Sequence, residues 1–161
     1  MNSVPLVFRV PLAAFLAATA AFFAGCTSMP TAQQMRLVLG GTQEVPPINT
    51  SASANGSIVV SPDRTVGGSV TTNGIAGTAA HIHIGSAGKN GPVIIPLVKS
   101  GDNVWSVPSG TKLTEAQYES FRAGDLYVNV HSSAHPGGEI RAQLTPSSTL
   151  SMQPSMGGGG Y

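Results

Sequence analysis

Residues 126–131 read Leu-Tyr-Val-Asn-Val-His, a strict alternation of apolar and polar side chains. Successive side chains of a β-strand point to opposite faces, so the apolar residues share one face and Tyr127, Asn129 and His131 share the other. This alternation is typical of an antiparallel sheet that packs one face on the core and leaves the other in water. The stretch therefore predicts a strand of such a sheet, with its polar side chains toward solvent.

The same alternation recurs on both sides of this stretch. In Glu139-Ile-Arg-Ala-Gln-Leu144 the apolar residues again share one face, and Glu139, Arg141 and Gln143 share the other. In Ala80-His-Ile-His-Ile-Gly85 the two histidines lie on the polar side. Three separate segments thus predict the same kind of strand, and each places its functional groups on the polar face.

Short runs of strand-forming residues continue along the chain, each closed by Gly, Pro, Asn, Asp or Ser. We expect strands near residues 35–39, 56–61, 65–72, 79–85, 92–98, 103–107, 126–132 and 139–144. About eight short strands at this spacing favour an all-β fold, an antiparallel β-sandwich or barrel, over a parallel sheet.

One segment departs from the strand pattern. Thr114-Glu-Ala-Gln117 resembles a capping box, in which the Thr hydroxyl and the Gln side chain satisfy the first backbone N–H groups of a helix. Gly124 is a typical helix stop. We predict one short helix over about residues 115–123, covering an end of the sandwich.

The two ends of the chain differ from this middle part in composition. Residues 1–25 have a charged start and a short apolar run, which are typical of an export signal. Phe23-Ala-Gly-Cys26 resembles the lipobox of bacterial lipoproteins, so we expect Cys26 to be the lipid attachment site. Ordinary secretion is the alternative. We expect residues 26–34 to be a tether and 146–161, rich in Pro, Ser and Gly, to be disordered.

Composition excludes some functions. The chain has 8 Lys and Arg against 7 Asp and Glu, and only 9% of its residues are charged. Nucleic-acid binding needs a basic patch, and no stretch of this sequence offers one. The sequence also contains no nucleophile elbow, paired-carboxylate motif or phosphate-binding loop, so a non-catalytic role is favoured over an enzymatic one.

Four motifs, in order, carry a resemblance to a known family. They read Leu39-Gly-Gly-Thr-Gln-Glu-Val-Pro-Pro47, Thr78-Ala-Ala-His-Ile-His83, Asn90-Gly-Pro-Val-Ile-Ile-Pro-Leu97 and the segment from Leu126 to Leu144. On these motifs the chain resembles the CHRD domain family over about residues 35–145. The resemblance implies an immunoglobulin-like β-sandwich with a similarity to copper–zinc superoxide dismutase. It implies no particular reaction.

The histidines are the candidate functional residues. His81 and His83 lie about 6–7 Å apart between their Cα atoms on one strand face, a spacing from which two imidazoles can converge on one ion. They are motif residues of the family, as is His131; His135 is at a position that varies. If their strands are neighbours, His81, His83 and His131 could bind copper or zinc.

Around these histidines, Tyr127, Asn129, Glu139 or Arg141 could orient the rings by hydrogen bonds. In the alternative interpretation the histidines bind only backbone, Glu or Asn groups and organise the neighbouring loops.

Two functions remain open on the sequence. The first is a lipid-anchored module of the bacterial cell envelope that binds a protein, a glycan or a metal ion. It would lie on the periplasmic face of the outer membrane in a cell with two membranes. The second is a copper- or zinc-dependent redox protein resembling superoxide dismutase. This chain lacks a disulfide pair and the further ligands of a second, bridged zinc site, and fold alone does not confer activity.

Overall fold

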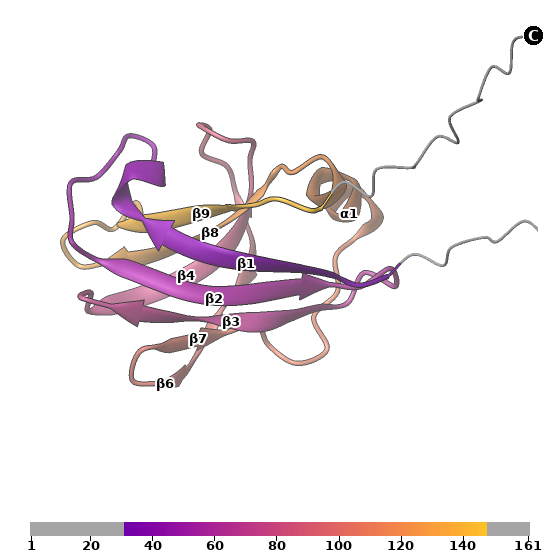
Figure 1. The fold of residues 1–161 in the computed structure, drawn as a ribbon, viewed down its shortest axis with the longest axis horizontal. Coiled ribbons are helices and arrows are strands. Elements are labelled where there is room, and N and C mark those ends of the chain that lie inside the picture. The colour runs from indigo at the N-terminus through magenta and orange to yellow at the C-terminus, as the bar shows by residue number, and fades with distance from the viewer. Residues whose placement is uncertain (1–30, 148–161) are drawn as a thin grey trace, which may run out of the picture.

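The computed structural model describes residues 31–147 and shows a curled, antiparallel β-structure with one short α-helix (Figure 1). The strands in chain order are β1 (Gln33–Gly40), β2 (Ser53–Val60), β3 (Val66–Asn73), β4 (Gly77–Ile84), β5 (Val93–Pro96), β6 (Val98–Gly101), β7 (Val104–Ser106), β8 (Leu126–Ser132) and β9 (Ile140–Leu144). A 3₁₀ turn at Gly41–Gln43 follows β1, and helix α1 (Glu115–Arg122) precedes β8. The all-β expectation is confirmed.

The strands form one sheet in the order β5-β4-β8-β9-β1-β2-β3-β7-β6. The two edge strands, β5 and β6, are consecutive in the chain, with only Leu97 between them. Between β9 and β1 the ladder is reduced to one pair, Gly40 with Arg141. The sheet therefore folds over at these two places into two packed layers. The segment expected as a single strand over 92–98 is the piece that passes from one layer to the other.

A hydrophobic core fills the space between the layers. The register places Ile82 opposite Val128, and Val128 opposite Ala142, so one apolar row crosses three strands. These three side chains are buried. Removing such aliphatic groups from water is the main favourable contribution to folding. The alternation read from the sequence thus fixes which face of β4, β8 and β9 points inward.

Helix α1 begins and ends as its sequence predicts. The Thr114 hydroxyl accepts a hydrogen bond from the backbone N–H of Gln117 at 3.2 Å, and the Gln117 side chain accepts from the backbone N–H of Thr114 at 2.8 Å. Phe121 is 1% exposed and anchors the helix on the core. The helix leads directly into β8 and helps to fix where that strand starts.

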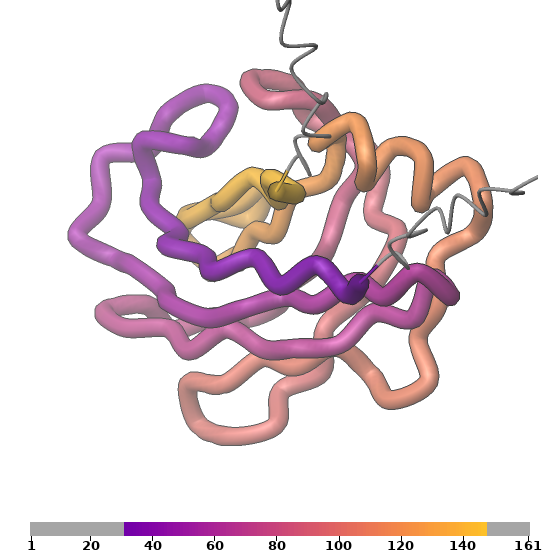
Figure 2. Tube along the Cα trace, turned by 45° about the vertical axis from the view of Figure 1, so that its right-hand side comes forward, coloured from indigo at the N-terminus to yellow at the C-terminus, as the bar shows by residue number. Residues whose placement is uncertain are grey.

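The polar face of β4, β8 and β9 is not exposed to solvent, which corrects the expectation of one wet side. Tyr127 and Asn129 are each 2% exposed and Arg141 is 1% exposed. Two loops cover this face, 41–52 and 85–91, and Figure 2 shows them rising on the same side of the molecule, next to β9.

Hydrogen bonds tie these loops together and to the sheet below. The Asn90 amide donates to the Val45 carbonyl at 2.7 Å, joining loop 85–91 to loop 41–52. Gln143 donates to the Gly85 carbonyl at 2.9 Å. Arg141 donates to the Asn90 side chain at 3.3 Å. Polar side chains of the sheet thus supply the partners that the loop backbone needs once it is buried.

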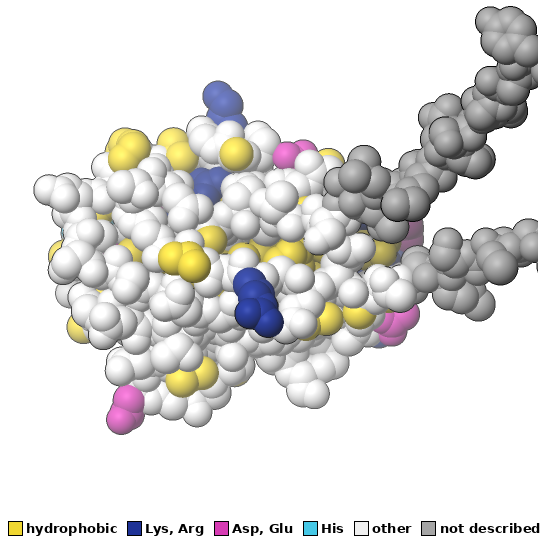
Figure 3. Space-filling view, viewed as in Figure 1, with side chains coloured by type: hydrophobic (Ala, Val, Ile, Leu, Met, Phe, Trp, Pro, Cys, Tyr) yellow, Lys and Arg dark blue, Asp and Glu magenta, His cyan; other side chains and the backbone are white. Residues whose placement is uncertain are grey.

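The outer surface over β1, β2 and β3 carries few charges, and they are scattered singly among uncharged side chains (Figure 3). Val38, on β1, is 68% exposed. None of the helices in the described part of the chain has the length and apolar character needed to cross a membrane.

Candidate metal centre

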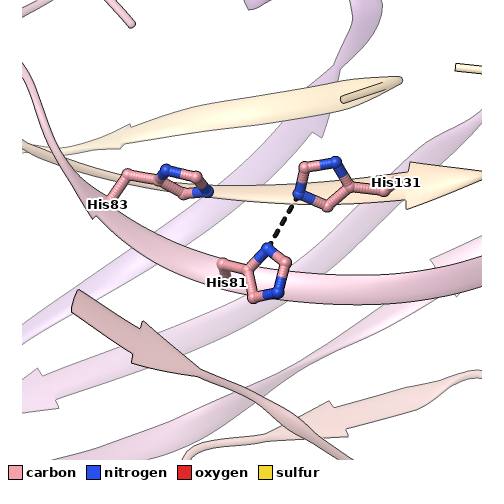
Figure 4. A group of neighbouring side chains, drawn as sticks. All are labelled: His81, His83 and His131. Atoms are coloured by element: carbon pink, nitrogen blue, oxygen red, sulfur yellow. Dashed lines mark hydrogen bonds between the residues drawn. The ribbon is translucent and has the colours of Figure 1, made fainter. Parts of the chain in front are cut away.

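Strands β4 and β8 bring the three predicted histidines together. The two strands pair antiparallel, with His81 opposite Asn129 and His83 opposite Tyr127. His131 lies on the same face, one strand repeat further along β8. One ring nitrogen from each histidine lies within 4.8 Å of the other two. Figure 4 shows the three rings converging from the two strands, as the sequence hypothesis requires.

Backbone carbonyls hold two of the rings in defined tautomers. His83 Nδ1 lies 2.9 Å from the Gly91 carbonyl oxygen, and His131 Nδ1 lies 2.9 Å from the Pro136 carbonyl oxygen. A carbonyl oxygen can only accept, so in both rings Nδ1 carries the proton and Nε2 carries the lone pair. A hydrogen bond of this type orients the metal-binding histidines of many proteins.

The third ring is linked to the second. His131 Nε2 lies 2.9 Å from His81 Nδ1. Because the proton of His131 is on Nδ1, its Nε2 accepts, and His81 Nδ1 is the donor in the metal-free protein. A metal ion replaces such a proton when it binds. His131 Nε2 and His81 Nδ1 therefore already face each other as two ligand atoms of one ion would.

The three rings differ in exposure, and burial disfavours the charged form of His81 and His83. His83 is 7% exposed and His131 is 8% exposed, whereas His81 is half-buried. Burial lowers the pKa of both His81 and His83, and the neighbouring histidines lower the two values further. Neutral imidazole is the form that binds metals, so the environment favours metal binding over protonation.

The donor set fits a transition metal. His83 Nε2 is buried and has no hydrogen-bond partner in the structure, and such an orphaned buried atom requires an explanation. Tetrahedral zinc bound at 2.0–2.1 Å places its nitrogen ligands about 3.4 Å apart. Ring nitrogens within 4.8 Å of one another reach this geometry after shifts of roughly 1 Å. Imidazole ligands suit zinc, copper and nickel.

Tyr127 supports the histidines by stacking. Its ring lies parallel to the His83 ring, with centroids 4.8 Å apart and an interplanar angle of 7°. The Arg141 guanidinium lies 3.4 Å from the centroid of the same Tyr127 ring. The Tyr127 hydroxyl accepts from the backbone N–H of Gly91 at 3.2 Å, and the carbonyl of that same glycine binds His83. Tyr127 therefore positions both the ring and the loop that orients it.

The other residues named from sequence have different partners. Glu139 accepts a hydrogen bond from the Thr50 hydroxyl at 2.7 Å, which ties down loop 41–52. Hydrogen bonds from Ser132 and Thr50 lower the pKa of Glu139, although partial burial opposes this. His135 is not part of the group of three. Cys26 and residues 1–30 and 148–161 lie outside the described residues, so the export signal, the lipid site and the disordered tail stay predictions. Of the segment expected as a tether, 26–34, the last two residues already belong to β1.

Sequence reasoning did not single out Glu44. This residue belongs to loop 41–52, is 5% exposed and has one carboxylate oxygen, Oε1, with no hydrogen-bond partner. Burial raises its pKa from 4.5 to about 7, although the positive charge of Arg141 opposes the rise. The available signal was an acid inside an otherwise uncharged motif, Leu39 to Pro47.

Comparison with known proteins adds the family. The model of the CHRD domain family matches residues 35–144. These residues run from within β1 to the end of β9 and include all three histidines. Searches of curated proteins and of solved structures found no match. The matched range covers more than half of the chain and almost all of the folded part. This chain belongs to the CHRD domain family.

Proposed function

We propose that this protein is a non-catalytic metal-binding module of the bacterial cell envelope, which binds copper or zinc through His81, His83 and His131. One observation carries the proposal. His83 Nε2 is a buried acceptor without a donor, and it lies beside His81 and His131, whose facing ring nitrogens share one proton that a metal ion would replace. A buried acceptor without a donor costs free energy, and a bound cation removes that cost.

The module is proposed to act at a membrane surface. Cys26 follows an export signal in a lipobox-like sequence, and acyl chains on its sulfur and amino group would hold the folded domain at the bilayer. In a cell with two membranes the proposed location is the periplasmic face of the outer membrane. A protein or glycan partner is part of this proposal.

Metal binding is tested with the full chain carrying Cys26→Ser, which removes the lipid site. We expect one equivalent of zinc or copper per chain by elemental analysis after dialysis against a micromolar concentration of the ion. His83→Ala should lose it. His135→Ala makes the same change outside the group and should retain it. Protein that takes up neither ion, or equal uptake by the His83 variant, would refute the proposal.

Lipid anchoring is tested by cell fractionation. The unaltered chain should pellet with membranes, and the Cys26→Ser chain should appear in the soluble envelope fraction. Metabolic labelling with a palmitate analogue should mark only the unaltered chain. Equal membrane association of both chains would contradict the anchor while leaving the metal proposal intact.

A further inference from the structure

Three buried side-chain atoms in the described part of the chain have no hydrogen-bond partner: Glu44 Oε1, Asn129 Oδ1 and His83 Nε2. Asn129 Oδ1 and His83 Nε2 are acceptors, and Glu44 Oε1 is one when the carboxyl group is ionised. Buried acceptors normally find donors, and three orphans are expected to be spread over a protein unless something draws them together. Here all three occur on the polar side of β4 and β8, which we call the polar layer. Asn129 lies on the same face of the sheet as the three histidines, directly opposite His81, and Glu44 belongs to loop 41–52 above it.

The two ends of the Asn129 amide face different groups. A methyl group added to Gly138 would lie 2.6 Å from Asn129 Nδ2 and 2.7 Å from Glu44 Oε1, so the amide nitrogen and the carboxylate oxygen lie on the same side. The amide oxygen therefore points away from Glu44. Asn129 lies close enough to the side chains of both Glu44 and His83 to interact with them.

From this placement we infer that Asn129 Oδ1 is the fourth ligand of the proposed metal ion and closes its coordination sphere. The inference rests on the proposed metal binding by the three histidines. Glu44 acts as a positioning residue, since a carboxylate beside Nδ2 holds the amide with its oxygen toward the histidines. The resulting set of three nitrogens and one oxygen suits a divalent ion such as Zn²⁺ or Cu²⁺.

A closed sphere has a functional consequence. Structural metal sites use four protein ligands, whereas catalytic sites keep one position open for water or substrate. With Asn129 bound, the ion has no position at which a substrate could react. The inference therefore assigns the site to metal binding or to stabilisation of the fold under loops 41–52 and 85–91.

The affinity of the Cys26→Ser chain for Zn²⁺ tests the ligand assignment. Asn129→Ala removes the oxygen and should weaken Zn²⁺ binding by roughly 10–100-fold. Asn129→Asp keeps the shape and supplies a charged oxygen, so it should bind Zn²⁺ at least as tightly as the unaltered residue. Glu44→Met should weaken binding by roughly tenfold through the loss of positioning. Asn55→Ala, at an exposed site on β2, is the matched control and should change nothing.

The open or closed state of the ion is tested with azide and the Co²⁺-loaded protein. With Asn129 in place, azide should leave the visible absorption spectrum of Co²⁺ unchanged. In Asn129→Ala azide should enter the vacated position and shift the spectrum. Unchanged Zn²⁺ affinity in Asn129→Ala, or an azide shift in the unaltered chain, would overturn the inference. Failure of the proposed function looks different, because the unaltered chain would then bind no metal.

Discussion

The two faces of β8 are buried to a similar extent but are built from different chemistry. Val128 and Val130 are completely buried in the hydrophobic core. Tyr127 and Asn129 are 2% exposed on the opposite face, under loops 41–52 and 85–91. Burying an apolar side chain stabilises the fold, whereas burying a polar one costs free energy unless it finds a partner. Only the second face leaves atoms unpaired, which is why the proposed function lies there.

The apolar face should carry the largest stability effect. Ile140 is completely buried and pairs with Val130. Ile140→Ala should reduce the free energy of unfolding by about 2–5 kcal/mol, from lost burial and the cavity left behind. Urea unfolding measures this loss. The folded variant should still bind Zn²⁺ with near-normal affinity, because no histidine contact changes. A variant that folds normally but no longer binds zinc would show that the two faces are energetically coupled.

Glu44 should lower the free energy of unfolding at alkaline pH, because its ionised carboxylate is buried in the polar face. Burial raises its pKa from 4.5 to about 7, so the folded state holds this proton more tightly than the unfolded state. Its contribution to stability is present below 4.5 and is lost as the pH rises through about 7. Between those limits the loss amounts to about 3 kcal/mol. Glu44→Gln is neutral throughout, so it should gain stability over the unaltered chain by about that amount toward pH 8.

Thermal unfolding of both chains across this pH range gives the measurement. Glu119→Gln, on the exposed side of helix α1, is the matched control and should keep the loss of stability that Glu44 causes between pH 4.5 and about 7. The contribution of His81 and His83 to stability depends on pH in the opposite direction. The lowered pKa values of His81 and His83 mean that their contribution is present above about 6.5 and is lost as the pH falls below it. A wild-type profile that keeps rising up to pH 8 and beyond would contradict the Glu44 assignment.

Gly138 tests how closely the polar layer is packed. Its φ angle is +127°, and an added methyl group would meet both Asn129 and Glu44 within 2.7 Å. Gly138→Ala should therefore cost about 1–3 kcal/mol of unfolding free energy. It should also weaken Zn²⁺ binding by separating the amide from the carboxylate. The neighbouring Gly137 has open space around it, so Gly137→Ala should have little effect on either measurement.

The smallest effect is expected from the loss of one buried hydroxyl group, that of Tyr127. Tyr127→Phe removes the hydroxyl that accepts from Gly91 but keeps the ring that stacks on His83. The cost should be about 0.5–1.5 kcal/mol, the usual net contribution of one hydrogen bond. Zinc affinity should change less than in Asn129→Ala. Tyr118→Phe, on helix α1, is the control and should leave zinc affinity unchanged. A loss of zinc affinity in Tyr127→Phe as large as that in Asn129→Ala would contradict this ranking and would indicate that the hydroxyl, through Gly91, is needed to hold His83.

Much of the fold could be read from local sequence, because local rules set it. The alternation in Leu126 to His131 assigned each side chain to the correct face, and the Thr114–Gln117 capping box predicted the start of helix α1. The expected single strand over 92–98 was only partly right. A sequence shows that a segment is extended, but not that Leu97 carries it from one layer to the other.

The sequence predicted which histidines form the candidate site, but not the hydrogen bonds and the burial that surround them. Alternation and the family motifs pointed to His81, His83 and His131, and strand pairing brings them together. The hydrogen bonds to the Gly91 and Pro136 carbonyls, which fix the tautomers, come from loops without periodicity. No spacing rule predicts where such loops turn back onto the sheet.

By itself, then, the sequence determined which face of each strand is polar, because side-chain direction alternates regardless of what lies above the sheet. Only the tertiary structure decided that this face is buried. Loop 41–52 brings Glu44 beside Asn129, and loop 85–91 closes over the Tyr127 ring. Alternation alone would leave these polar side chains in water. Burial under loops that are distant in the sequence orients them, disfavours their charged forms and leaves some of their atoms without hydrogen-bond partners. Those properties make His83 and its neighbours a candidate metal centre.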